Sequence, residues 1–307
     1  MTPAVESAAP PVPAARRPGD WLSIGADRWL PLLLLLPSIL MIAATIAYPL
    51  IQALLYSFAD GTLLRPGRFV GLGNYARLLA SAEFRHALIF STVFAVASVG
   101  GSYLLGLGLA LLLNLDIPFR GIFRVALLLP WIVPSIVSIV SWRMLLIDEH
   151  ALANVLIRSL GGSPVFFLSD ETWAVVAVVL VKIWRAFPFM MLSILAALQG
   201  IDRTLYEAAA IDGASRPQMF RHITLPQIRN LSIVLCLLMT IWSVNDFDTP
   251  WLLTQGGPAF ATENLVLLSH RYTFGRNQLG LGSATSFVTL LILMVLIVVM
   301  LRRQREQ

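Results

Sequence analysis

Residues 88–114 read LIFSTVFAVASVGGSYLLGLGLALLLN, and this stretch decides the fold class. A helix needs roughly 20 mostly apolar residues to cross the hydrocarbon core of a bilayer. The stretch exceeds that length and contains no charged side chain. It therefore predicts a membrane-spanning helix in an integral membrane protein.

Five further stretches meet the same requirement, and with 88–114 they predict an all-α bundle of six transmembrane helices. Three of the six spans contain one or two charged residues, whereas the first, the second and the last contain none. We expect a flexible cytoplasmic tail over 1–28, one transmembrane domain over 29–302 and a short cytoplasmic tail over 303–307. The predicted spans are 31–58, 88–114, 122–146, 172–199, 231–253 and 283–301.

Composition supports this class over a soluble one. Of the 307 residues, 57% are hydrophobic and 13% are charged, whereas a soluble domain usually carries about a quarter charged residues. The single cysteine excludes an internal disulfide,. The net charge of +5 comes almost wholly from arginines that flank apolar runs, so we expect no nucleic-acid partner,.

Arginines are moderately enriched in the two tails and in the loops on the same side of the predicted bundle. The positive-inside rule then places both termini in the cytoplasm, which requires an even number of spans. The sequence has no phosphate-loop motif of the G-x-x-x-x-G-K-[ST] kind,. No predicted span contains a histidine or a glutamate, so neither a metal site nor a catalytic site is expected,.

The long inner loop over 200–230, after the fourth span, predicts two short helices. Asp202 can cap the first helix, and Gly213 can end it in a left-handed conformation,. Ser215 and Gln218 have the spacing of a capping box for the second helix, which we expect Pro226 to end,. A rigid helix pair at the membrane surface suits transmission of movement from a soluble partner. On physical grounds alone, an interfacial helix pair resting on lipid headgroups is the alternative.

Specific residues in this loop resemble a known motif. Glu207-Ala208-Ala209, Gly213 and the run from Ile223 to Pro226 match the EAA loop of ABC importer membrane subunits,. The resemblance implies that the loop docks into a cleft on a cytoplasmic ATPase subunit. The predicted coupling residues are Glu207, Ala208, Ala209, Asp212, Gly213, Ile223, Leu225 and Pro226.

The resemblance extends over roughly 30–302. The segments 71–75 (GLGNY), 182–185 (KIWR) and 253–258 (LTQGGP) look like those of carbohydrate-uptake permeases of the maltose/trehalose and glycerol-phosphate type. This implies a permease of the type I ABC importer kind in a prokaryotic cell membrane. The implied function is half of a translocation pathway, with no catalytic activity of its own.

The resemblance also implies a set of partners. A second permease subunit, a different chain, would complete the pathway, and membrane lipid would surround it. A cytoplasmic ATPase dimer would hold ATP and magnesium, so this chain itself would bind no cofactor. An extracytoplasmic solute-binding protein would deliver the solute, for which a di- or oligosaccharide is favoured.

Charges within the membrane have two interpretations. Lys182 and Arg185 share one face of the fourth span, while Asp246 and Asp248 lie two residues apart in the fifth,. An unpaired charge at the bilayer centre costs at least about 2.5 kcal/mol. One aspartate is therefore expected to pair with the basic face. The cluster either lines the sugar pathway or forms a structural ion pair between two helices.

Hydroxyl-rich solutes need hydrogen-bonding groups and aromatic faces. The substrate-pathway candidates are Lys182, Trp184, Arg185, Trp242, Asn245, Asp246 and Asp248.

Other functions remain open. The importer could carry glycerol phosphate or another polyol derivative. An ion-coupled secondary transporter could use Asp246 as its coupling carboxylate, but it would leave the EAA loop unexplained. A membrane enzyme is a third alternative, for which no nucleophile–base pair is evident.

Overall fold

The computed structural model describes residues 30–65 and 67–305. The predicted tail over 1–28 and the last two residues of the other predicted tail lie outside the described residues. The chain divides into two units, Met1–Gln52 and Ala53–Gln307. Helices make up the described secondary structure, except for a single bridge between Ala59 and Phe69.

The first described helix confirms the predicted first span. It consists of α1 (Leu30–Ile42), the π-helical turn η2 (Ala43–Ala47) and α2 (Tyr48–Ser57), and the unit boundary falls within α2. Residues 33–57 are long and apolar enough to cross a membrane. Pro49 follows the π turn closely; the wider turn keeps the helix continuous past a residue that cannot donate a backbone hydrogen bond.

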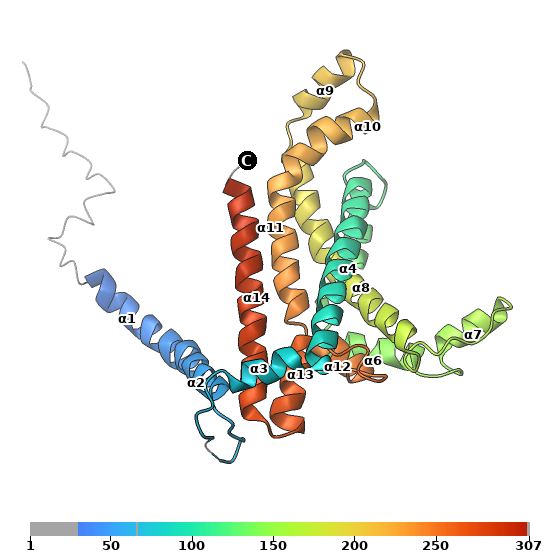
Figure 1. Ribbon diagram of the computed structural model, residues 1–307. Coiled ribbons are helices and arrows are strands. Elements are labelled where there is room, and N and C mark those ends of the chain that lie inside the picture. The colour runs from blue at the N-terminus through green and yellow to red at the C-terminus, as the bar shows by residue number, and fades with distance from the viewer. Residues whose placement is uncertain (1–29, 66, 306–307) are drawn as a thin grey trace, which may run out of the picture. The chain divides into compact units, whose positions relative to one another are not determined.

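Four long helices form the bundle of the second unit: α4 (Ala82–Leu113), α8 (Glu171–Gln199), α11 (Leu225–Val244) and α14 (Leu279–Arg305) (Figure 1). Each lies in a stretch that can span a membrane. Shorter helices connect them: α3 (Gly73–Ala80), α5 (Arg120–Ile132), α6 (Ser135–Leu146), α7 (Leu152–Ser159), α9 (Arg203–Ile211), α10 (Arg216–Met219), α12 (Asp248–Thr254) and α13 (Leu265–His270). The π turns η3 (Phe220–Thr224) and η4 (Arg271–Gly275) follow α10 and α13.

The bundle is organised around close packing of α4 against α8. Small residues recur every four positions on one face of α4, at Ser98, Ser102, Gly106 and Ala110, and all four are buried. A Cβ atom added to Gly106 would lie 2.7 Å from the Cβ of Met190. Small residues allow helix backbones to approach in membranes, where packing replaces the hydrophobic effect as the driving force.

A turn after the first span explains the 71–75 motif. The buried Asn74 side chain donates through Nδ2 to the carbonyl oxygens of Ser57 (2.9 Å) and Ala59 (2.7 Å). The Tyr75 hydroxyl lies 2.7 Å from the Ser57 hydroxyl. A Cβ at Gly280, in α14, would collide with this turn, so glycine there lets α14 pass close to it,.

The structure corrects the predicted third span. Instead of one straight helix over 122–146, α5 and α6 are bent by 91° at a short break. Pro134 is the reason: it disfavours helical geometry at the preceding Val133, which is extended with ψ 132°,. The described chain therefore has five straight candidate spans, or six if the bent pair forms one.

The predicted fifth span is also broken. The structure places α11 over Leu225–Val244, and α12 begins separately at Asp248. Asn245, Asp246 and Phe247 connect the two helices. The prediction of a single helix over 231–253 was therefore wrong. The Asp246 carboxylate accepts two hydrogen bonds from Thr249 in the first turn of α12, so a new helix begins there and α11 does not continue.

We predict that Gly106→Ala destabilises the bundle by about 1–3 kcal/mol, the usual cost of overpacking. The added methyl group would force α4 away from α8. Gly108→Ala on the same helix is the matched control, since a Cβ there meets nothing within 4 Å. The thermal midpoint of the detergent-solubilised protein provides the measurement. Equal midpoints for both variants would contradict the close-packing argument.

Candidate functional site

The predicted coupling loop folds into the expected helix pair. Asp202 caps α9, accepting a hydrogen bond from the Thr204 backbone at 2.9 Å; bonds from Thr204 also lower the pKa of the Asp202 carboxyl. Gly213 has φ +77°, the left-handed conformation expected for a helix end,. Ser215 and Gln218 form the predicted capping box at the start of α10.

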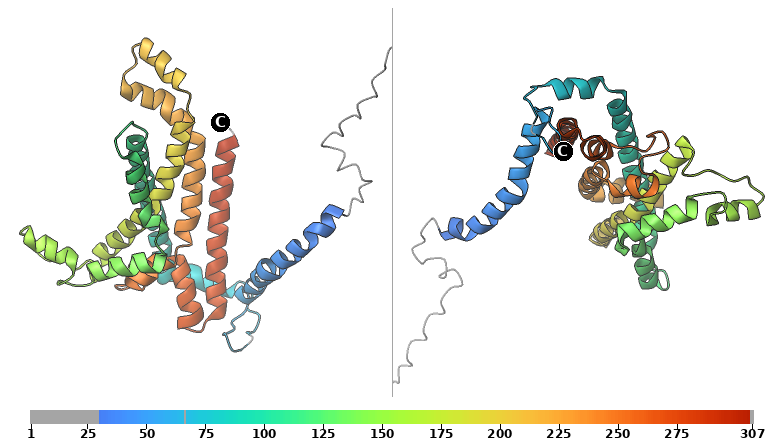
Figure 2. Two further views of the ribbon diagram at one scale, coloured as in Figure 1. Left: turned by 180° about the vertical axis from the view of Figure 1, so that it is seen from behind. Right: turned by 90° about the horizontal axis from the view of Figure 1, so that it is seen from below.

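The two coupling helices are held together and projected outward. The Tyr206 hydroxyl of α9 lies 2.9 Å from the Thr224 hydroxyl of η3. Helix α9 has no buried residue, and Ile211 is 87% exposed. Figure 2 shows α9 and α10 extending beyond one end of the bundle.

A pocket with a volume of about 330 Å³ lies between the helices of the coupling loop. Of the predicted coupling residues, it gathers Ala209, Asp212, Gly213 and Ile223, whereas Glu207 and Ala208 are exposed on α9 outside the lining.

Pro226 has a different role from the predicted one. Instead of ending the second coupling helix, it lies in the first turn of α11, and the helical path runs on from Arg216 to Val244. The π turn η3 precedes it, with Leu225 N–H bonded to the Phe220 carbonyl. The wider turn accommodates the proline ring and its missing donor. Residues Arg216–Val244 thus form one continuous helix, the coupling rod, which joins the coupling loop to the membrane helix.

The intramembrane charges form a buried ion pair. Lys182 Nζ lies 2.7 Å from Asp246 Oδ2, with relative side-chain exposures of 11% and 6%. Thr249 adds two hydrogen bonds to the same carboxylate, from its backbone N–H at 3.0 Å and its hydroxyl at 2.7 Å. Asn264 donates to the Asp246 carbonyl at 2.6 Å. This network joins α8 to the break between α11 and α12.

The other two charges lie beside this pair without joining it. Arg185 Nη1 donates to the Thr249 hydroxyl at 3.3 Å, while its Nε has no hydrogen-bond partner among the described residues. The exposed Asp248 accepts from the Ser135 hydroxyl of α6 at 2.9 Å. One aspartate therefore pairs with the basic face and the other points elsewhere, as the spacing predicted.

The aromatic and amide candidates lie in different places. Trp184 packs edge-on against Trp142, with ring centroids 5.5 Å apart, whereas Trp242 packs on Phe189 at 5.1 Å. Asn245 is exposed and lines a separate cavity of about 360 Å³ between α11, α13 and α14. The structure therefore does not gather the candidate pathway residues into one pocket.

A second charged cluster was missed by sequence reasoning. Arg271 Nη2 lies 2.6 Å from the buried Glu263 and 3.4 Å from Glu83, and Arg276 lies 2.8 Å from Glu83. Burial raises the pKa of Glu263 to about 7, against the opposing charge of Arg271. Glu83 is nearly two hundred residues away in the chain, so no local pattern could reveal the contact.

Comparison with known proteins identifies the family. Residues 102–305 match the family model described as "Binding-protein-dependent transport system inner membrane component". This chain belongs to that family. It is therefore a multi-pass inner-membrane subunit of a binding-protein-dependent ABC transporter, and its role is transport.

Two curated relatives of this permease have named functions. The trehalose/maltose transport system permease protein MalF of Thermococcus litoralis is 37% identical over 271 residues, covering 88% of this chain and 92% of the relative. The sulfoquinovosyl glycerol transport system permease protein SmoG of Agrobacterium fabrum is 34% identical, covering 92% of each chain.

A solved structure confirms the fold of the permease. A chain of a bacterial ABC transporter involved in import of the acidic polysaccharide alginate matches with a TM-score of 0.81 and 22% identity. The match covers 93% of this chain and 98% of that chain. A second structure of such an alginate transporter includes a periplasmic protein bound to an alginate pentasaccharide.

We predict that Asp246→Asn or Lys182→Met alone destabilises the permease by about 3–5 kcal/mol, because each leaves an unpaired buried charge. The double variant should recover much of the loss, since neither charge remains. Asp248→Asn is the control, because that carboxylate is exposed. Melting of the purified chain measures all four. A double variant no better than the singles would show that the charges act separately.

Glu263 predicts a pH dependence of stability. Folding raises the pKa of the Glu263 carboxyl from 4.5 to about 7. The protonated carboxyl therefore contributes its full stability to the folded state below pH 4.5, and this contribution is lost as the pH rises through about 7,. The thermal midpoint of the wild type should therefore fall across that interval more steeply than that of Glu263→Gln. Glu149→Gln, at an exposed position, should leave the slope unchanged. Parallel curves for all three proteins would contradict the assignment.

Proposed function

We propose that this chain forms half of the translocation pathway of an ATP-driven carbohydrate importer. The observation that supports this most strongly is the exposed coupling helix pair, which continues without a break into α11. A displacement of α9 and α10 is therefore transmitted directly to a membrane helix. Tilting of that helix would switch the pathway between outward and inward access.

The proposed partners follow from this arrangement. A cytoplasmic ATPase dimer binds the coupling loop and holds ATP and magnesium, so this chain acts without a cofactor or a catalytic residue. A second permease subunit, a different chain, completes the pathway. An extracytoplasmic solute-binding protein supplies the solute. Both termini of the chain lie in the cytoplasm, on the same side as the coupling loop.

A di- or oligosaccharide is the proposed solute class. The relative named for trehalose and maltose supports it, while the relative named for sulfoquinovosyl glycerol keeps a polyol derivative as the alternative. We assign the pathway to the exposed candidates Trp242, Asn245 and Asp248. The buried Lys182–Asp246 pair then fixes the helices that present them.

An affinity purification from native membranes in mild detergent tests the assembly. We expect an ATPase, a second permease and a solute-binding protein to copurify with the tagged chain. The binding protein is then screened calorimetrically against sugars and polyol phosphates. Recovery of the tagged chain alone, in a form that transports without ATP, would favour the ion-coupled alternative.

We predict that Glu207→Lys or Gly213→Asp abolishes uptake while the chain still inserts and folds. Each changes an exposed position of the coupling loop, so the partner contact is lost and the bundle is not. Gly161→Asp, in the loop after α7, and Glu171→Lys, at the start of α8, are matched controls; Gly161 has the same left-handed backbone, with φ +81°. Radiolabelled sugar uptake and membrane abundance are measured together. Normal uptake by both coupling variants would refute the assignment.

A further inference from the structure

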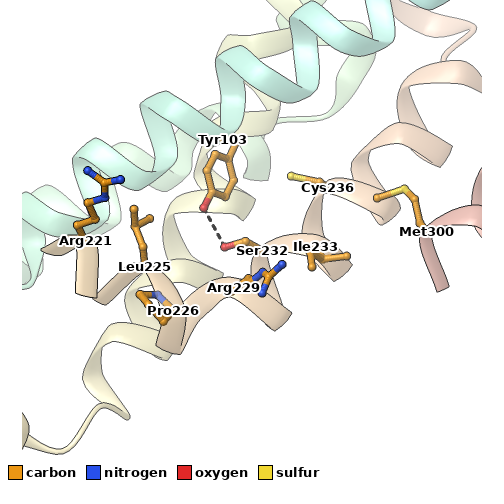
Figure 3. A pocket seen from close by; sticks show the side chains of 9 residues that line it. All are labelled: Tyr103, Arg221, Leu225, Pro226, Arg229, Ser232, Ile233, Cys236 and Met300. Carbon is orange, nitrogen blue, oxygen red and sulfur yellow. Dashed lines mark hydrogen bonds between the residues drawn. The ribbon is translucent and has the colours of Figure 1, made fainter. Parts of the chain in front are cut away.

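A cavity of about 680 Å³ lies between α4, α11 and α14 near the coupling loop (Figure 3). Tyr103 of α4 and Ser232 of α11 form a hydrogen bond of 2.8 Å on its wall. Met300 lines it from α14. Leu225 and Pro226, two of the predicted coupling residues, line it as well, whereas α9 contributes none of the lining residues.

One face of the coupling rod gives the cavity its chemistry. Arg221, Leu225, Arg229 and Ile233 follow one another at four-residue intervals, and Cys236 comes next on the same face,. Arg221 lies nearest the coupling loop, Leu225 lies between the two arginines, and Ile233 and Cys236 lie farther along α11 (Figure 3). The lining is therefore cationic at one end and mainly apolar along the rest.

The cations in this cavity are not matched by carboxylates. Within the described residues, neither Arg221 nor Arg229 has an acidic group at ion-pair distance. Among the described residues that line the cavity, none is acidic. Both arginines are exposed, so a ligand can reach them from outside the chain.

We propose that this cavity binds an anionic phospholipid of the inner leaflet. The phosphate binds Arg221 and Arg229, and an acyl chain covers Ile233 and Cys236, which lie beyond Arg229 on the same face. Basic pockets between membrane helices on the cytoplasmic side suit such headgroups. The inner-leaflet assignment rests on the proposed orientation of the coupling loop. An acidic protein segment would match the two arginines but not the apolar remainder.

Cys236 provides the measurement, because it is the single cysteine of the chain and is half-buried in the cavity wall. The full chain is purified in detergent, and the rate of Cys236 alkylation by a small maleimide is followed. Phosphatidylglycerol is titrated in parallel with phosphatidylcholine of the same acyl chains. We expect phosphatidylglycerol to slow alkylation at much lower concentration.

The variants test the two arginines directly. Each arginine near an anionic headgroup contributes about five-fold in affinity. The double variant Arg221→Ala/Arg229→Ala should therefore raise the phosphatidylglycerol concentration that half-protects Cys236 by about twenty-five-fold. Arg203→Ala/Arg216→Ala removes the same charge from exposed positions outside the cavity and should shift it little. Native mass spectrometry should show retained phosphatidylglycerol in the wild type and the control pair but not in the cavity pair.

Several outcomes would overturn the proposal. Equal protection by both lipids, or an equal shift in both double variants, would show that no anion site exists. Protection by glycerol phosphate as effective as by phosphatidylglycerol would assign the site to a soluble anion. Full protection in the assembled transporter without added lipid, and none by lipid in the single chain, would assign the cavity to a partner subunit. The assay uses neither ATP nor uptake, so its failure leaves the proposed coupling function standing.

Discussion

The approach of α4 to α8 is the constraint on which the rest of the bundle depends. In lipid, two helices gain nothing from burying apolar surface, so their association rests on close packing. The face of α4 with Ser98, Ser102, Gly106 and Ala110 removes the side chains that would hold the backbones apart. Helices α5 and α11 then pack against the same α8 surface, around Met190, Met191 and Ile194. A bulkier residue at Gly106 would displace every helix placed by that surface.

The buried ion pair depends on this packing in turn. Lys182 lies on α8, and Asp246 lies where α11 ends, so the pair forms only when both helices are in place. A buried pair seldom adds net stability, but breaking it costs several kcal/mol. Its effect is therefore to fix one geometry: the carboxylate holds Thr249 and so sets where α12 begins. The exposed Asp248 reaches Ser135 of α6 from that starting point.

Features that depend on residues close together in the sequence were predicted more successfully than features that depend on contacts between distant parts of the chain. The caps at Asp202, Ser215 and Gly213 depend on neighbours within a few residues, and the sequence predicted all three correctly. The stretches without internal charges also form the long apolar helices that the sequence predicted. The break after Val244 was missed because Asp246 was considered only as a partner for the basic face of α8, whereas its carboxylate also accepts two hydrogen bonds from Thr249 at the start of α12. Pro226 was predicted to end a helix and does not, whereas Pro134, placed inside a predicted straight span, follows the extended Val133 at a sharp bend.

Pro226 shows how one local feature links coupling and membrane functions. A straight α-helix would be interrupted there, and α10 would move independently of α11. The π turn at Phe220–Thr224 prevents this and leaves the helical path from Arg216 to Val244 continuous. The same turn carries Arg221, whose guanidinium group lies in the cavity wall, and Thr224, which bonds to Tyr206 of α9. A ligand bound beside Arg221 and Arg229 would therefore contact the rod at the point where movement enters the membrane. Such a ligand shifts the equilibrium between inward and outward states only to the extent that it binds the two positions of the rod with different free energies.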